Sequence, residues 1–338
     1  MGIKEINYQM KNNQQVVSDS NPIYRFDALT GFWGMPNVEQ KISFKYGDNA
    51  VSLVKHNQYG NRDKPVDMNS RDKNFICYGG SHTWGAYVEQ DERYSDFLTE
   101  RTGRRFLNIG HPSFGLDQIS LAIEHKSSEF NPEGIVIEQY PWAFHRVLNA
   151  YVNGYLKPYY YLLPDGELRF DPLSSLARFR LYRQVVGEYR LYKKEFLEMR
   201  GNINIKEDYD PALDPVFLLW KSSYYEYAYE LFGKIAERIK DYCDKKGIKL
   251  LIFLTANLQH FFPESATELI DYDLPCKKLA AVLEKYRVPY VNLASDLIGE
   301  QRKGRPVIFP DGHLNRNGHF KVAECLSLEL KRRGWLSE

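Results

Sequence analysis

Short apolar runs alternate with amphipathic stretches from about Asn74 to the end of the chain. The runs are four to six residues long and partly β-branched or aromatic, as is typical of strands buried in a parallel sheet. We therefore predict an α/β fold with a sheet of about five parallel strands, covered by helices on both faces. The predicted strands are Phe75–Tyr78, Phe106–Ile109, Gly134–Glu138, Lys249–Leu254 and Pro289–Leu293.

Between and after these runs lie segments whose apolar residues recur every three or four positions, as on one face of a helix. In the clearest segment, Leu231, Ile235 and Ile239 share a face, and Gly247 follows as a stop signal. The predicted helices are Glu89–Thr102, Leu116–Ser128, Tyr227–Lys246, Pro275–Tyr286 and Asn315–Arg333.

Two regions do not fit this alternation. Residues 1–73 are rich in Asn, Gly, Asp and Pro with isolated aromatic residues, which predicts an irregular or β-containing extension packed on the core. Residues 142–223 separate the third and fourth predicted strands and are dense in Tyr, Arg and Leu. We expect one α/β domain made of residues 74–141 and 224–338, with residues 142–223 inserted as a lid or an interface.

The insertion carries two local patterns. Asp165 and Gly166 stand between two aromatic runs and predict a hairpin. Leu173–Met199 has basic and aromatic residues at helical spacing. Because acidic residues interrupt the basic face, we interpret this segment as an amphipathic helix over the core rather than a membrane or nucleic-acid surface. The insertion is also where copies of the chain could join into an oligomer.

Charge and hydropathy narrow the classes of partner. In the 338 residues, 45 Lys and Arg nearly balance 44 Asp and Glu, so no overall field favours nucleic acid or an anionic membrane. A small-molecule or carbohydrate partner fits this balance better. No apolar run reaches the length of a signal peptide or a membrane span, and we expect a cytoplasmic protein without a membrane span.

Metal, cofactor and disulfide signals are weak in this sequence. The four cysteines are scattered without a CxxC pair, and we expect them to be reduced core residues. No group of His, Cys or carboxylate residues has metal-ligand spacing, and no glycine-rich phosphate loop occurs. We predict neither a metal nor a cofactor.

The first candidate for chemistry is the segment FICYGGSHTWG at residues 75–85. It is an apolar strand that ends in two glycines, a serine and a turn into a helix, which places Ser81 at the carboxyl edge of the sheet, where α/β enzymes build their sites. The glycines permit a tight turn and a close approach of substrate. A serine that only caps the next helix gives the same pattern, so the segment alone leaves both interpretations open.

The second candidate is FPDGHLNRNGH at residues 309–319, a polar loop that leads into the last predicted helix. Asp311 precedes His313 by two residues and can fix the tautomer of the imidazole and stabilise its charged form, which a serine nucleophile requires of its base. His319 is expected to pack or to cap the helix. The alternative is that Asp311 and Asn315 are only turn and N-cap residues.

At this point the chain resembles the SGNH (GDSL-like) hydrolases, a superfamily of esterases, lipases and acyltransferases with a flavodoxin-like three-layer α/β/α sandwich. GGSHTWG is similar to the first block, whose serine is the nucleophile. LNIGHPSFGLDQ is similar to the second block, with Asn108 and Gly110 at its strand-end asparagine and glycine. DGHLN is similar to the last block. The resemblance covers roughly residues 57–140 and 225–335.

The chain departs from the family pattern at three places. Gly80 stands where an aspartate commonly precedes the nucleophile, and Ser113 stands at the glycine whose N–H helps to form the oxyanion hole. The third block, VIEQYPW, lacks the asparagine that donates to the oxyanion, and Gln139 is the nearest substitute. The resemblance implies an oxyanion hole made of Ser81, Ser113 and Gln139. Losing one donor costs about two to three orders of magnitude in turnover.

Further polar residues near these blocks are candidates for binding substrate. His82 follows the predicted nucleophile but faces away from it in a strand-to-helix turn, so it is expected to be structural or substrate-facing rather than the base. His145 and Arg146 could bind an anionic group, with a surface ion pair as the alternative. The predicted substrate-binding residues are His82, Asn108, Gly110, His111, His145 and Arg146.

The resemblance implies that Ser81 is the nucleophile, His313 its base and Asp311 the support of that base. We predict a serine-dependent ester hydrolase or O-acyltransferase acting on an acylated, O-acetylated carbohydrate or secondary metabolite. One alternative is a non-catalytic binding or scaffold protein that kept the fold. Another is a thioesterase or transferase that uses a carrier-bound acyl group, with the basic face between Arg178 and Lys194 docking an acidic acyl-carrier protein.

Overall fold

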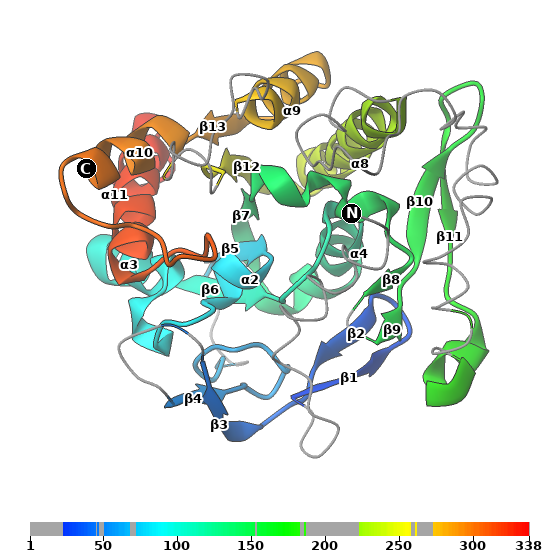
Figure 1. Cartoon of the computed structure of the whole chain (residues 1–338), viewed down its shortest axis with the longest axis horizontal. Helices are drawn as coiled ribbons and strands as arrows, with labels where there is room; N and C mark the ends of the chain where they lie inside the picture. Colours follow the sequence, from blue (N-terminus) through cyan, green and yellow to red (C-terminus); the bar gives the residue numbers. More distant parts are fainter. Residues whose placement is uncertain are drawn as a thin grey trace.

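The computed structural model describes residues 23–44, 46, 51–67, 72–152, 154–182, 186, 223–257, 261 and 273–337. At its centre is a parallel sheet with the strand order β13-β12-β7-β5-β6 (Figure 1). Numbered along the chain, these strands lie in the order 2-1-3-4-5, which is the flavodoxin-like arrangement. The strands are β5 Asn74–Gly79, β6 Phe106–Gly110, β7 Pro132–Gln139, β12 Lys249–Leu254 and β13 Tyr290–Asn292.

Alternating side chains of each strand enter two separate hydrophobic cores. In β5, Ile76 and Tyr78 pack on one face, and Phe75 and Cys77 pack on the other. In Figure 1, α4 and α8 lie to the right of the sheet, and α3, α10 and α11 lie to its left. The first core is covered by α4 Leu116–Lys126, α8 Ser223–Lys246 and α9 Leu274–Lys285. The second is covered by α3 Tyr94–Thr102, α10 Ala294–Arg302 and α11 Arg316–Arg332. The predicted three-layer α/β/α sandwich is confirmed.

The predicted elements agree with the structure except in detail. All five predicted strands are present, with ends that differ by no more than two residues. The predicted helix Glu89–Thr102 is divided at Arg93 into a 3-10 turn, η1 Gln90–Glu92, and α3. Helix α10 was not predicted, because Leu297 is its one large buried apolar residue and Gly299 interrupts the pattern.

The part of residues 1–73 that the structure describes packs against the core. It forms two antiparallel hairpins, β1 Tyr24–Asp27 with β2 Gly31–Gly34 and β3 Glu39–Ser43 with β4 Val51–Lys55. Phe32 and Trp33 belong to the first hydrophobic core. Beyond the hairpins, the buried Arg62 donates hydrogen bonds to the carbonyls of Trp84, Gly85 and Val88. The extension thereby supports the turn that follows Ser81.

The described part of the insertion lies over the first core. It comprises η3 Pro141–Leu148, β8 Tyr151–Val152, β9 Tyr155–Leu156, β10 Tyr159–Leu162, β11 Leu168–Asp171 and η4 Ser175–Arg178. The hairpin predicted at Asp165 and Gly166 is confirmed, since β10 and β11 are antiparallel and Gly166 has a φ of +81°.

The helix predicted at Leu173–Met199 is only partly described. Its first residues form the 3-10 turn η4 instead of a continuous α-helix. Most of the predicted helix, including Lys194 and so the far end of the predicted carrier-docking face, lies outside the described residues. Within the described part of the chain, no helix combines the length and the apolar character needed to cross a membrane.

Candidate active site

Ser81 is the first residue of the short helix α2 Ser81–Trp84, which follows β5 directly. This helix lies so close to the end of β6 that a Cβ atom on Gly110 would be 2.3 Å from the Trp84 nitrogen. A glycine is therefore required at position 110 for α2 to sit on the sheet edge. Gly110 serves the packing of the nucleophile turn, and its role in binding substrate stays a prediction.

The loop before α11 brings His313 to Ser81. His313 Nε2 lies 2.9 Å from Ser81 Oγ, and His313 Nδ1 lies 3.1 Å from Asp311 Oδ2. The His313 backbone N–H also donates to Asp311 Oδ1 at 3.2 Å. Asn315 caps α11 by accepting from the Gly318 N–H, so it takes the cap role, whereas Asp311 faces the imidazole. A hydroxyl, an imidazole and a carboxylate in this order are the arrangement that activates a serine nucleophile.

Asp311 is held in its ionised form by its neighbours. Partial burial would raise its pKa, but hydrogen bonds from His313 and from the Tyr87 hydroxyl outweigh this and lower the pKa below its usual value. Tyr87 was not predicted. Its φ is +69°, a left-handed conformation that is rare for an aromatic residue and is found at functional sites. Its ring packs edge-on against His313 at 5.1 Å.

Beside Ser81 is a cavity of about 20 Å³, which we call the Ser81 cavity. It is closed on one side by the end of β7 and on the other by η3. Its lining residues are Gly80, Ser81, His82, Phe114, Ile119, Glu138, Gln139, Tyr140, Ala143 and Arg146. The cavity therefore contains three of the predicted site residues outside the Ser81–His313–Asp311 set, namely His82, Gln139 and Arg146.

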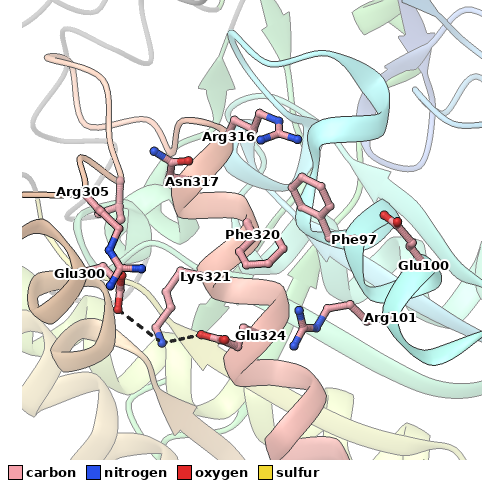
Figure 2. Close-up of a pocket in the computed structure, with 11 residues that line it drawn as sticks. Phe97, Glu100, Arg101, Glu300, Arg305, Arg316, Asn317, Phe320, Lys321 and Glu324 are labelled. Carbon is pink, nitrogen blue, oxygen red and sulfur yellow. Dashed lines mark hydrogen bonds and ion pairs between the residues drawn. The ribbon is translucent and has the colours of Figure 1, made fainter. Parts of the chain in front are cut away.

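A much larger groove of about 940 Å³ lies between α3, α10 and α11 (Figure 2). Part of its charge is paired within the groove: Lys321 bridges Glu300 and Glu324, and Arg305 also contacts Glu300. Ser81, His313 and Asp311 are not among its lining residues.

The three predicted oxyanion donors differ in their backbone conformation and in whether their N–H groups already donate to another group. Ser113 has a φ of +66°, so the serine adopts the left-handed conformation that favours the family's glycine. In the described part of the chain, the N–H groups of Ser81 and Ser113 donate to no backbone carbonyl. Gln139 lines the Ser81 cavity, but its amide already donates to the Tyr140 carbonyl at 2.7 Å. The role of these residues in an oxyanion hole stays a prediction.

Two other predicted substrate-binding residues are buried, and their role in binding substrate stays a prediction. Asn108 is fully buried, and its amide donates to the Thr83 carbonyl and to Ser95 Oγ. These hydrogen bonds tie β6 to the nucleophile helix. His111 is also buried, and its ring packs on Trp33 at a centroid distance of 4.1 Å. Both were predicted from their place in or beside the second block of the resemblance, but both side chains are buried in the protein.

His145 and Arg146 differ from each other. His145 is not among the residues that line the Ser81 cavity, and burial lowers its pKa to about 4. Arg146 lines the cavity, and within the described residues it forms no ion pair. The surface ion pair considered as the alternative for Arg146 is thus not seen there. Binding of substrate by either residue stays a prediction.

Glu138 is a cavity residue that the sequence did not single out. It is 4% exposed, its Oε2 accepts from the Gly80 N–H at 3.4 Å, and its Oε1 lies 3.9 Å from His82 Nδ1. Burial raises its pKa to about 7, against the lowering effects of the Gly80 hydrogen bond and the Arg146 charge. Burial and the neighbouring His313 also hold the pKa of His82 well below its ordinary value. The sequence signal that could have identified Glu138 is its place as a charged residue inside an otherwise apolar strand.

Glu138→Gln is expected to stabilise the protein at alkaline pH. A carboxyl group whose pKa is raised by folding favours the folded state below its unfolded pKa and loses that effect as the pH rises to about 7. The shift corresponds to about 3 kcal/mol. Chemical denaturation should show the variant gaining about 2 to 3 kcal/mol over wild type at pH 8 and almost nothing at pH 4.

The matched control for this measurement is Glu129→Gln, because Glu129 is exposed in the turn after α4. Its difference from wild type should stay nearly constant between the two pH values. An equally constant difference for Glu138→Gln would mean that the carboxyl group at position 138 titrates normally.

Comparisons with known proteins give structural likeness only. No family model and none of the curated proteins matches the chain. Among solved structures, 79% of the chain aligns with 51% of a two-domain esterase active on acetylated mannans, at 13% identity and a TM-score of 0.39. The chain thus spans about half the length of that esterase.

Two shorter proteins align over nearly their whole length. An acetyl xylan esterase matches 76% of the chain over 99% of its own, with 12% identity and a TM-score of 0.43. A lipase/acylhydrolase from Enterococcus faecalis matches 78% of the chain over 97% of its own length, with 12% identity and a TM-score of 0.37. Likenesses this partial identify neither a substrate nor a reaction for this chain, so its chemistry has to follow from its own residues.

Proposed function

We propose that the chain is a serine-dependent ester hydrolase or O-acyltransferase of the SGNH (GDSL-like) kind. The observation that carries the proposal is the continuous line of contacts from Ser81 Oγ through both nitrogens of His313 to Asp311. The non-catalytic alternative expects these three side chains to lie apart or the cavity to be plugged. The contact distances and the open Ser81 cavity both support the enzyme.

In the proposed reaction, Ser81 Oγ attacks the ester carbonyl carbon while His313 Nε2 accepts the hydroxyl proton. The carbonyl electrons move onto the oxygen, which the N–H groups of Ser81 and Ser113 stabilise. When this intermediate collapses, the bond to the alcohol breaks, His313 returns the proton to the leaving alcohol, and the acyl group stays on Ser81. Water or an acceptor alcohol then removes the acyl group by the same steps in reverse.

The size of the Ser81 cavity supports a short acyl group. Its volume of about 20 Å³ is close to that of one water-sized group, which suits the methyl of an acetyl ester better than a long acyl chain. On the other side of His313, half-buried aromatic rings form a rim made of Phe44, Tyr46, Tyr87 and Phe309. Flat rings of this kind pack well against sugars. Both features favour an O-acetylated carbohydrate as the substrate.

Labelling by a fluorophosphonate tests the proposed function. Wild type and a Ser113→Ala variant should each gain the mass of one adduct, because Ser113 would act through its backbone N–H, which alanine keeps. Ser81→Ala and His313→Ala should gain none, because the first lacks the nucleophile and the second lacks its base. A folded wild-type protein that stays unlabelled would overturn the proposal.

A further inference from the structure

We infer that the Arg146 guanidinium is the third oxyanion donor, in the place that the family's third-block asparagine would take. The inference rests on the proposed function and adds to it a catalytic residue from the insertion. It answers a specific question that the sequence raises, since VIEQYPW has no asparagine and one of the two N–H groups of the Gln139 amide donates to the Tyr140 carbonyl.

The first step of the argument is the position of the guanidinium. Arg146 Nη1 donates to the Phe114 carbonyl at 3.4 Å, and it lies 3.1 Å from where a Cβ atom on Gly80 would be. Gly80 precedes Ser81 and Phe114 follows Ser113, so the guanidinium sits between the residues that flank the two predicted backbone donors. Arg146 lines the same cavity as Ser81. From this place the guanidinium can act as a third donor to an oxyanion held by both N–H groups.

The second step is that the charge of Arg146 is available. Within the part of the chain that the structure describes, no carboxylate lies within ion-pair distance of it. Glu138 is the acidic residue that acts most strongly on the charge of Arg146. Because its pKa is about 7, it is partly protonated near neutral pH. A half-buried guanidinium with one long hydrogen bond keeps several N–H groups free for an anion. The tetrahedral intermediate supplies such an anion at this place.

The third step is that the backbone at Arg146 is fixed. Its carbonyl accepts a hydrogen bond from Lys157 Nζ at 2.7 Å, and the same ammonium group lies 2.7 Å from Asp117 Oδ2. Both side chains of this pair are buried, at 1% and 0% exposure. A donor held before the reaction begins stabilises developing charge better than one that must be reorganised. Lys157 and Asp117 therefore position the backbone from which the Arg146 side chain extends.

Gly80 also fits this arrangement. The family's aspartate at this position would bring a side chain to within contact of Arg146 Nη1 and place a carboxylate beside it. That carboxylate would neutralise the guanidinium. The absence of a side chain at Gly80 therefore leaves room for the Arg146 guanidinium beside Ser81.

The test measures hydrolysis of 4-nitrophenyl acetate, a neutral ester, by wild type, Arg146→Ala and Arg146→Lys. For Arg146→Ala, kcat should fall by about 10² to 10³-fold while KM changes little, because only the transition state carries the negative charge. Millimolar guanidinium should restore part of the activity of the alanine variant, which a merely structural loss would not allow. Arg146→Lys should lie between the two. Arg169→Ala, an exposed arginine on β11, is the matched control and should equal wild type.

The outcomes separate the inference from the proposed function. An Arg146→Ala protein with an unchanged kcat, or with a raised KM alone, would overturn the inference and leave the hydrolase standing. Inactivity of Arg146→Ala without rescue by guanidinium, together with a lowered melting temperature in both variants, would also overturn it. A folded wild type with neither turnover nor fluorophosphonate adduct would overturn the proposed function itself and the inference with it.

Discussion

Asp311→Asn is expected to lower kcat for a simple aryl ester by about 10³ to 10⁴-fold. Asp311 Oδ2 lies 3.1 Å from His313 Nδ1 and favours the tautomer with its proton there, which leaves His313 Nε2 to take the proton of Ser81. An asparagine amide would donate to Nδ1 instead and favour the tautomer that carries its proton on Nε2. That tautomer cannot act as the base, although the loop and its Tyr87 contact can keep their positions.

Kinetics of single and double variants provide the sharpest measurement. Ser81→Ala should reduce turnover at least as far as Asp311→Asn, and the double variant should be no slower than Ser81→Ala, because residues that act as one unit are not additive. Asp165→Asn, in the exposed turn of the β10–β11 hairpin, is the matched control. Multiplication of the two effects in the double variant would show that Asp311 acts independently of Ser81.

The sheet and the meeting of Ser81 with His313 could be predicted because both depend on local sequence signals. A parallel strand buried on both faces is a short apolar run, and β12 was predicted with the same ends as the structure has. Short polar loops at the carboxyl edge of such a sheet lie close together whatever their separation along the chain. That rule placed Ser81 at this edge, whereas the pairing of residues 81 and 313 followed from the resemblance to the SGNH (GDSL-like) hydrolases.

The walls of the cavity could not be predicted because their environment depends on distant parts of the chain. Arginines are mostly exposed, so a surface ion pair was a natural expectation for Arg146, but the buried Lys157 draws its backbone inward. Glu138 is buried only because β5 and the nucleophile helix cover the end of β7. No residue preference signals the positive φ of Tyr87.

Asn108 is a residue for which the sequence pattern suggested a binding role without containing the direction of its side chain. A polar residue at a strand end suggests a pocket, and the resemblance strengthened that suggestion. In the structure its side chain satisfies buried polar groups of the Thr83 and Ser95 region, and its Oδ1 accepts from the Gly110 N–H. Whether a strand-end amide faces substrate or the protein is decided by the direction of its side chain, which the pattern does not contain.

Lys157→Met is expected to destabilise the fold by about 3 to 5 kcal/mol. The substitution leaves Asp117 buried without its counter-ion and removes the donor to the Arg146 carbonyl. Removing one partner of a buried pair is costly because the other charge stays desolvated, so the double variant Asp117→Leu with Lys157→Met should recover much of the stability. Chemical denaturation of the three proteins measures both effects.

Lys55→Met is the matched control, since Lys55 pairs with Glu39 at 3.0 Å on the surface, where both side chains are more than half exposed. An exposed pair contributes about 0 to 1 kcal/mol, so the same chemical change should have little effect there. Comparing the stability of the two lysine variants therefore distinguishes the effect of losing a charge from the effect of losing a buried partner. If Lys157→Met cost no more than Lys55→Met, the insertion would not be anchored to the core by this pair, and Arg146 would need another support.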